Sequence, residues 1–246
     1  MAEFQERVAL VTGAARGLGQ AIAERLARGK ARVLMVDRDG AAVEAAAERL
    51  ARKGLASTAH TADVTDEAAL AALVARIGGE GNRLDILVNN AGGWRYGHYN
   101  EITIEDWHWT FDTNVLSVFL CVRAFAGVMI AQRYGRIINI ASVDGYLAKT
   151  RLPHYAAAKA AVISLTKSLA EELGPHQILV NAVAPGGIAT ETAKAQGWLE
   201  SRIPAIPLRR NAEPEDIAEV VAFLASEQNR FVTGETVMAS GGAVMM

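Results

Sequence analysis

Residues 7–28, RVALVTGAARGLGQAIAERLAR, decide the fold of this chain. The apolar run RVALV is typical of a buried strand, and AIAERLAR has the amphipathic pattern of a helix. Between them, the glycines of TGAARGLG allow the backbone to turn sharply, and the N–H groups at a helix start attract phosphate. Glycine-rich turns often serve only as tight connections, but this strand–turn–helix context favours a dinucleotide pyrophosphate. The candidate residues are Gly13, Arg16, Gly17, Leu18 and Gly19.

The same alternation of short β-branched runs and longer alanine-rich segments continues to the end of the chain. We expect strands near 7–11, 32–36, 57–61, 85–88, 136–140, 178–183 and 236–239. We expect helices near 17–28, 41–53, 66–77, 104–132, 153–173 and 213–225. Nearly all-apolar strands separated by helices indicate a parallel sheet covered on both faces. The predicted fold class is therefore α/β, a Rossmann-like, doubly wound parallel sheet of about seven strands with helices on both faces.

One irregular stretch interrupts this alternation. No proline-rich or Gly/Ser-rich linker divides the chain, so we expect a single domain over 1–246. Residues 184–212 carry three prolines and two adjacent glycines and break the pattern. A loop of that length in a compact domain is usually functional, so we expect a substrate lid at about 186–212. Open α/β sheets bind ligands at the carboxyl ends of their strands, where the candidate residues fall.

Composition excludes several classes of function. The formal net charge is −2, and acidic and basic residues are interspersed without a basic run. We therefore expect a small-molecule partner, and neither nucleic acid nor an acidic membrane surface. The N-terminus lacks the basic and then apolar plan of a signal peptide, and no apolar run is expected to span a bilayer. The expected location is the cytoplasm.

Cysteine and histidine usage argue against disulfide and metal sites. The single cysteine, Cys121, excludes an internal disulfide and lies in an apolar segment where a buried thiol is expected. The five histidines form no ligand cluster, so no metal site is expected. We expect His154 to lie on a solvated flank of its helix.

The acid after the second strand bears on the choice of cofactor. Asp37 is placed to accept hydrogen bonds from the adenosine ribose hydroxyls, and its charge would repel a 2′-phosphate. NAD is therefore preferred. Arg16 and Arg38 leave NADP open, because guanidinium groups beside the ribose could accommodate that phosphate.

Three side chains supply what hydride transfer at a C–OH or C=O centre needs. A proton must enter or leave the oxygen as hydride reaches or leaves the carbon, and Tyr155 is the candidate acid/base. Lys159 lies four residues on, on the same helix face, where its charge could stabilise the phenolate. Ser142 could hold the reacting oxygen. A Tyr-x-x-x-Lys spacing also occurs by chance on half-exposed helices, so the other segments must decide.

Taken together, these residues resemble the short-chain dehydrogenase/reductase family over essentially the whole chain. The matching motifs are Thr12-Gly13-x-x-x-Gly17-x-Gly19, Asp63-Val64, Asn89-Asn90-Ala91-Gly92, Asn114, Ser142, Tyr155-x-x-x-Lys159 and Pro185-Gly186 followed by Ile188 and Thr190. Within the family the chain is similar to 3-oxoacyl-acyl-carrier-protein reductases and to alcohol and sugar dehydrogenases. Gly187 and Ala239-Ser240 depart from the family's usual residues and leave substrate details open.

The resemblance implies roles for the matched residues. Asp63 and Val64 would contact the adenine ring, and the turn with Asn90, Ala91 and Gly92 would lie beside the cofactor riboses. Asn90 could equally have a structural role in that turn. Pro185 and Gly186 would begin the loop at the nicotinamide end of the site, where backbone groups near Ile188 and the Thr190 side chain would hold the carboxamide.

In the family, the catalytic lysine also binds the nicotinamide ribose, so Tyr155 and Lys159 belong to the cofactor site as well. The asparagine at position 114 would hold a water that links Lys159 to solvent. Asn114 stands in an apolar helical segment, where an amide is costly unless partnered, and a helix irregularity satisfied locally is the alternative.

Substrate residues are expected near the cleft mouth. The candidates are Trp94, Arg95, Asp144, Lys149, Arg151 and Trp198. The cationic members, Arg95, Lys149 and Arg151, suggest a carboxylate, phosphate or sulfonate on the substrate.

The sequence thus predicts an oxidoreductase that moves a hydride between NAD(H) and a secondary alcohol or ketone, anionic or polyol-like. The alternative is an NADPH-dependent 3-oxoacyl-acyl-carrier-protein reductase. Asp37 disfavours it, as does His176, which stands where those enzymes carry a carrier-docking arginine, although Arg133 is retained. A non-catalytic nucleotide sensor is disfavoured because the Ser/Tyr/Lys set is intact. The resemblance implies a homotetramer.

Overall fold

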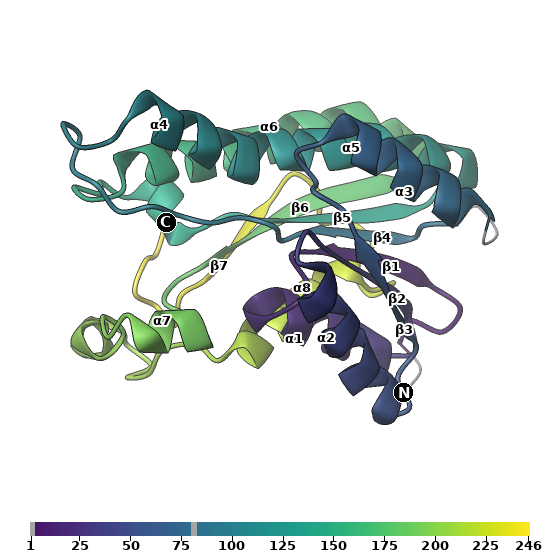
Figure 1. Cartoon of the computed structure of the whole chain (residues 1–246), viewed down its shortest axis with the longest axis horizontal. Coiled ribbons are helices and arrows are strands. Elements are labelled where there is room, and N and C mark those ends of the chain that lie inside the picture. Colours follow the sequence, from purple (N-terminus) through teal and green to yellow (C-terminus); the bar gives the residue numbers. More distant parts are fainter. Residues whose placement is uncertain (1–2, 80–82) are drawn as a thin grey trace.

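All seven strands form one parallel sheet, in the order β3-β2-β1-β4-β5-β6-β7 (Figure 1). The computed structural model describes residues 3–79 and 83–246. The strands are β1 (Val8–Thr12), β2 (Arg32–Asp37), β3 (Ser57–Thr61), β4 (Ile86–Asn89), β5 (Gly135–Ile140), β6 (Ile178–Pro185) and β7 (Thr236–Ala239). The predicted fold class is confirmed, and each strand lies within two residues of its expected bounds.

Helices cover both faces of the sheet. They are α1 (Gly17–Arg28), α2 (Gly40–Arg52), α3 (Glu67–Gly79), α4 (Ile104–Phe111), α5 (Ser117–Gln132), α6 (Pro153–Leu173), α7 (Glu191–Ala195) and α8 (Pro214–Ala225). Figure 1 shows α1, α2 and α8 below the sheet and α3, α4, α5 and α6 above it. The chain adds β2 and β3 on one side of β1 and then returns to place β4 on the other side, so a topological switch point lies between β1 and β4.

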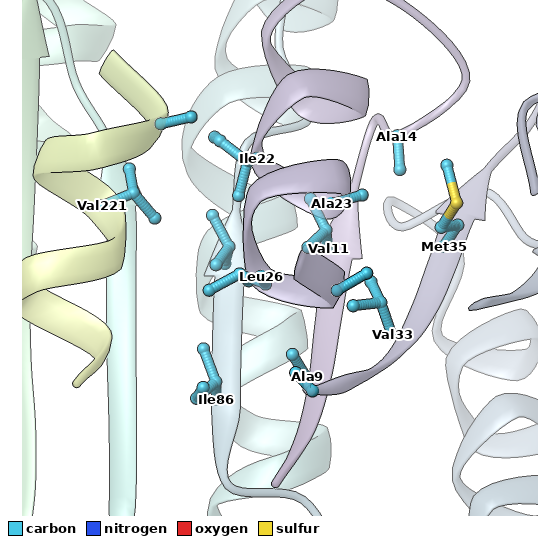
Figure 2. Packing of buried hydrophobic residues seen from close by; sticks show 14 of the residues in the cluster. Ala9, Val11, Ala14, Ile22, Ala23, Leu26, Val33, Met35, Ile86 and Val221 are labelled. Carbon is cyan, nitrogen blue, oxygen red and sulfur yellow. The ribbon is translucent and has the colours of Figure 1, made fainter. Parts of the chain in front are cut away.

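The core below the sheet contains the buried apolar side chains of β1 and α1. Val11 on β1 and Ile22 and Leu26 on α1 are fully buried, and Val221 of α8 packs into the same cluster (Figure 2). The spacing of Ile22 and Leu26 places both on the face of α1 that meets the sheet. This packing fixes the start of α1 against the end of β1.

The expected helix over 104–132 is interrupted by a π-helical turn, Asp112–Leu116, between α4 and α5. Asn114 lies in that turn and is fully buried. Its Nδ2 donates to the carbonyls of Thr110 at 2.9 Å and Gly93 at 2.8 Å. The amide therefore has partners both in the helix and in the loop that follows β4, the central strand of the sheet.

The segment Ile104–Gln132 is, by length and composition, long and apolar enough to cross a bilayer, so the expectation that no run is long enough was wrong. Its apolar character has an explanation in the fold. Leu120, Cys121 and Phe125 are buried against the sheet, and Arg123 forms an ion pair with Glu67 of α3. A core helix of this kind passes the same test, so length and composition alone carry little weight here.

The stretch 186–212 is partly ordered as α7 and a 3-10 segment, Glu200–Ala205. Backbone hydrogen bonds join its two ends, from Ala189 N to Ala212 O at 2.7 Å and from Ala212 N to Gly187 O at 3.0 Å. The loop is therefore closed at its base. Figure 1 places α7 below the sheet, across from the layer that contains α4 and α6.

The core packing gives a stability prediction. Changing Ile22 to Ala should lower the free energy of unfolding by about 2–5 kcal/mol, because it opens a cavity between α1, β1 and α8. Glu44 is exposed on α2 and serves as the control, since Glu44→Ala should change stability by less than about 0.5 kcal/mol. Denaturant unfolding measures both variants. Equal losses would contradict this packing.

Candidate functional site

A cleft of about 910 Å³ runs along the carboxyl ends of the strands. The loops that follow β1 to β6 all contribute to its lining. Every residue expected in the cofactor and catalytic sets lines it: Gly13, Arg16, Gly17, Leu18, Gly19, Asp37, Arg38, Asp63, Val64, Asn90, Ala91, Gly92, Asn114, Ser142, Tyr155, Lys159, Pro185, Gly186, Ile188 and Thr190. The fold thus gathers residues from six separate loops into one concave site.

At one end of the cleft is the glycine turn between β1 and α1. Gly13 and Gly17 have φ angles of 64° and 55°, a region that favours glycine. A Cβ on Gly19 would lie 2.1 Å from the Gly13 carbonyl oxygen, so only glycine fits there. Arg16, the residue before α1, caps no helix N–H with its side chain, and the first turn holds no acidic residue. The turn therefore suits an anionic group that approaches the backbone closely.

Asp37 is held at the end of β2 by two backbone donors. Its Oδ2 accepts a hydrogen bond from Ala15 N and its Oδ1 accepts one from Asp39 N, both at 3.1 Å. The nearby arginine Arg16 forms an ion pair with Asp39 at 2.8 Å. Asp39 therefore offsets part of the positive charge that Arg16 and Arg38 bring close to Asp37.

Asp63 follows β3 and is fixed by Thr65. It accepts hydrogen bonds from the Thr65 backbone N at 2.9 Å and from Thr65 Oγ1 at 2.7 Å. Burial raises the pKa of Asp63, but the two bonds from Thr65 and the charge of Arg38 outweigh burial and leave the pKa lowered. The carboxylate is an ionised acceptor at the cleft wall.

Lys159 is buried and reaches the end of β5. Its Nζ donates to the Ile140 carbonyl at 2.8 Å and lies 5.7 Å from the centre of the Tyr155 ring. Burial lowers the pKa of Lys159 to about 8. The ammonium thus stands beside the phenol at the place where the β5 backbone ends.

The pKa of Tyr155 is raised, and not lowered as the sequence suggests. Burial is the main cause, and the negative charge of Asp144 adds to it, whereas a hydrogen bond from the Ser142 side chain lowers the pKa. Ser142 Oγ also accepts a hydrogen bond from Asp144 N at 3.1 Å. Burial therefore favours the protonated form of the phenol, which is the form that can donate a proton to an oxygen in the cleft.

Gly92 leaves room for two polar groups. A Cβ at this position would lie 2.8 Å from Asn114 Oδ1 and 3.5 Å from Lys159 Nζ. Asn114 Oδ1 also accepts a hydrogen bond from Gly93 N at 3.3 Å. The Asn114 amide has hydrogen-bond partners nearby, as the alternative of a locally satisfied helix irregularity expects. It also lies close to Gly92, as Lys159 Nζ does.

Five of the six expected substrate residues line the cleft: Trp94, Asp144, Lys149, Arg151 and Trp198. The ring of Trp94 meets that of Tyr155 edge to face at 6.2 Å. Lys149 and Asp144 form a largely buried ion pair at 2.7 Å. Arg95 does not line the cleft, because its guanidinium lies over the Trp109 ring at 4.4 Å and pairs with Asp106 at 2.8 Å.

The sequence interpretation missed two features of the site. Arg202, on the 3-10 segment of the lid, lines the cleft with its guanidinium 4.8 Å from the centre of the Trp198 ring. The four-residue spacing from Trp198 was the available signal. His154 is fully buried, so the expected solvated flank is wrong, and neither ring nitrogen has a hydrogen-bond partner within the described residues. Burial lowers the pKa of His154.

No group of three or more His, Cys, Asp or Glu side chains among residues 3–79 and 83–246 is placed to hold a metal ion.

Comparison with known proteins identifies the family. A family model described as enoyl-(acyl carrier protein) reductase matches residues 13–244. The 3-oxoacyl-[acyl-carrier-protein] reductase of Aquifex aeolicus is 38% identical over 243 residues, 98% of each chain. The chain belongs to the short-chain dehydrogenase/reductase family. As a short-chain dehydrogenase/reductase, it is an oxidoreductase that acts on CH–OH groups and binds a nicotinamide cofactor.

Other relatives agree with this assignment. The 3-oxoacyl-[acyl-carrier-protein] reductase of Staphylococcus aureus is 40% identical over 241 residues, 96% of this chain and 98% of its own. A short-chain type dehydrogenase/reductase from Mycobacterium marinum has a similar structure, with a TM-score of 0.95, 33% identity and coverage of 100% and 98%. A candidate NAD(P)-dependent gluconate 5-dehydrogenase from Beutenbergia cavernae, solved with NADP at low occupancy, has a TM-score of 0.92, 33% identity and 98% coverage of both chains.

The space at Gly92 gives a prediction for the site. Gly92→Ala should lower kcat by up to about 100-fold, because the new Cβ would lie 2.8 Å from Asn114 Oδ1 and displace the amide that lies beside Lys159. Gly174→Ala is the matched control, since a Cβ there meets nothing within 4 Å. Steady-state kinetics and a thermal melt separate turnover from folding. Full activity of Gly92→Ala would show that Asn114 does not need its present position.

Proposed function

We propose that this protein transfers a hydride between a nicotinamide cofactor and the carbon of a secondary alcohol or ketone, with Tyr155 as the general acid/base. The observation that carries this proposal is the meeting of Tyr155, Ser142 and Lys159 in the cleft that also holds the glycine turn. A proton donor, a cation and a phosphate-binding turn in one site are what this reaction requires.

The residues of the cleft fit a dinucleotide along its length. The glycine turn would bind the pyrophosphate, Asp37 the adenosine ribose, and Asp63 with Val64 the adenine. Asn90, Ala91 and Gly92 would lie beside the second ribose. In the loop that Pro185 and Gly186 begin, backbone groups near Ile188 and the Thr190 side chain would hold the carboxamide. The bound nicotinamide supplies or accepts the hydride.

Each catalytic side chain has a distinct task. The Tyr155 hydroxyl gives its proton to the ketone oxygen during reduction and takes it back during oxidation. Ser142 donates a hydrogen bond to that oxygen as negative charge develops on it. Lys159 contributes positive charge beside the phenol and binds the cofactor ribose. Asn114 joins the loop after β4 to its own helix beside Lys159, through hydrogen bonds from its Nδ2 to the carbonyls of Gly93 and Thr110.

For the cofactor, we propose a preference for NAD(H). Asp37 supports this, because backbone donors fix its carboxylate at the end of β2, where it would accept hydrogen bonds from the adenosine ribose and repel a 2′-phosphate. The ion pair between Arg16 and Asp39 also occupies one of the two arginines that could receive such a phosphate. The NADP found in the Beutenbergia cavernae relative favours the other cofactor.

For the substrate, 3-oxoacyl thioesters are the leading candidates. The two relatives that are 38% and 40% identical over nearly the whole chain are 3-oxoacyl-[acyl-carrier-protein] reductases. A small anionic or polyol-like alcohol is the second candidate. Arg151 in the cleft and the gluconate 5-dehydrogenase relative favour it.

We further propose that the chain works as one domain, with residues 186–212 as its lid, in a cytoplasmic homotetramer. The exposed apolar residues Ile104, Trp107, Leu116 and Phe119 on the α4–α5 segment support assembly, because such side chains gathered on one helical segment favour a protein partner. Residues 1, 2 and 80–82 of the proposed domain lie outside the described residues.

The test of the reaction uses Tyr155→Phe. A panel of acetoacetyl thioesters, polyols, hydroxy acids and cyclic alcohols, each with NAD(H) and NADP(H), should give at least one turned-over substrate. Tyr155→Phe should then lower kcat by about 100-fold or more with little change in cofactor affinity, because only the transferable proton is removed. Tyr146→Phe is the control and should keep full activity. Retained turnover in Tyr155→Phe would disprove the assigned role.

The test of the cofactor uses Asp37 and Asp39. Wild-type kcat/KM should favour NAD over NADP, and Asp37→Ala should reduce that preference by about tenfold or more, which corresponds to ~1.4 kcal/mol. Asp39→Ala releases Arg16 and should improve NADP use without loss of NAD use. A wild-type preference for NADP would refute the proposal.

A further inference from the structure

Most charged side chains that line the cleft already have a partner of opposite sign. Arg16 pairs with Asp39, Lys149 with Asp144, and the charge of Arg38 acts on Asp63. Lys159 donates to the backbone carbonyl of Ile140, and its Nζ lies 5.7 Å from the centre of the Tyr155 ring. Positive charge in these positions is therefore already committed to the protein itself.

Arg151 and Arg202 differ from these groups. Both line the cleft, and no acidic side chain in the described part of the chain lies within ion-pair distance of either guanidinium. Each guanidinium lies over an aromatic ring instead, Arg151 at 5.7 Å from the centre of the Tyr96 ring and Arg202 at 4.8 Å from that of Trp198. Stacking on a ring restrains a guanidinium and leaves its N–H groups free to donate.

The two arginines come from different loops around the cleft. Arg151 lies two residues before the start of α6, and its carbonyl accepts a hydrogen bond from Gly97 N at 3.0 Å, which ties it to the loop after β4. Arg202 belongs to the lid that follows β6. Figure 1 shows α6 above the sheet and α7, the helix of the lid, below it.

The lid position of Arg202 depends on Gly187. A Cβ on Gly187 would lie 3.3 Å from Trp198 Cζ3 and 2.9 Å from Asn211 Oδ1, so the absence of a side chain lets Trp198 pack against the loop base. Asn211 Nδ2 donates to Leu199 O at 3.1 Å, and Ser201 Oγ donates to Trp198 O at 2.7 Å. These contacts order the turn that carries Arg202.

We propose that Arg151 and Arg202 together bind an anionic group of the substrate, a carboxylate or a phosphate, across the mouth of the cleft. Two guanidinium groups without acidic partners match the charge and the fork geometry of such an anion. The inference rests on the proposed hydride transfer and adds to it the substrate's charge and a lid residue that recognises it. Arg95 and Lys149 have no part in this recognition.

Matched pairs of ketones test the proposal and separate the two sources of the anion. Levulinate and its methyl ester differ in a carboxylate, and the acetoacetyl thioesters of 4′-phosphopantetheine and pantetheine differ in a phosphate. In at least one pair, Arg151→Gln and Arg202→Gln should each raise KM for the anionic member by about tenfold, because each removes a charged hydrogen bond. KM for the neutral member and kcat for both should change less than about twofold.

Two variants serve as controls. Arg95→Gln removes a neighbouring arginine that is committed to Asp106, and Lys194→Gln removes a lid charge outside the cleft lining. Neither should change KM for the anionic ketone by more than about twofold. Wild-type preference for the anionic member should also weaken as ionic strength rises.

The outcomes are distinct for the two proposals. Turnover of the neutral and anionic members with equal kcat/KM would overturn the anion site and leave hydride transfer standing. A rise in cofactor KM in place of substrate KM in Arg202→Gln would also overturn it. Calorimetric titration with levulinate and 4′-phosphopantetheine measures binding without turnover. If the affinity for both ligands is unchanged in Arg151→Gln and Arg202→Gln, the anion site is overturned, even if hydride transfer also failed.

Discussion

The site depends on a small hydrogen-bonded junction between the ends of β1 and β4. Thr12 Oγ1 accepts hydrogen bonds from the backbone N of Asn90 at 3.0 Å and of Ala91 at 2.9 Å. In return, Asn90 Nδ2 donates to the carbonyls of Thr12 at 2.9 Å and Gly13 at 3.1 Å. These bonds close the switch point of the sheet and fix the glycine turn relative to the loop after β4. Asn90 thus has a clear structural role, and this role is compatible with a place beside the cofactor.

The second constraint is the cost of burying Lys159. A buried ammonium with one carbonyl partner is poorly compensated, which is why burial lowers its pKa to about 8. The raised pKa of Tyr155 has the same origin, since burial disfavours the phenolate. Near neutral pH the Tyr155 phenol therefore keeps the proton that ketone reduction requires, whereas the Lys159 ammonium can lose its proton at a pH closer to neutral than an exposed lysine would.

Much of the fold and of the site could be predicted because both follow from local patterns. The runs RVALV and RVLMV and the spacing of Ile22 and Leu26 report burial directly, and parallel strands bring their carboxyl ends together whatever the loops contain. The helix irregularity at Asn114 was expected only as an alternative, and its second partner, the Gly93 carbonyl, lies in a distant loop that the helix sequence does not reveal. The same holds for the commitment of Arg95 to Asp106 and for the burial of His154. Such pairings across elements leave no periodic signal in one sequence.

The central claim is that hydride passes directly between the cofactor and the carbon that bears the reacting oxygen, within the cleft that holds Tyr155 and Lys159. Mass spectrometry of the product formed with reduced cofactor deuterated at C4 of the nicotinamide measures this directly. The account predicts one deuterium on the carbinol carbon of the product when the label is on one face of the nicotinamide, and none when it is on the other face. A product that carries no cofactor-derived deuterium from either face would contradict it.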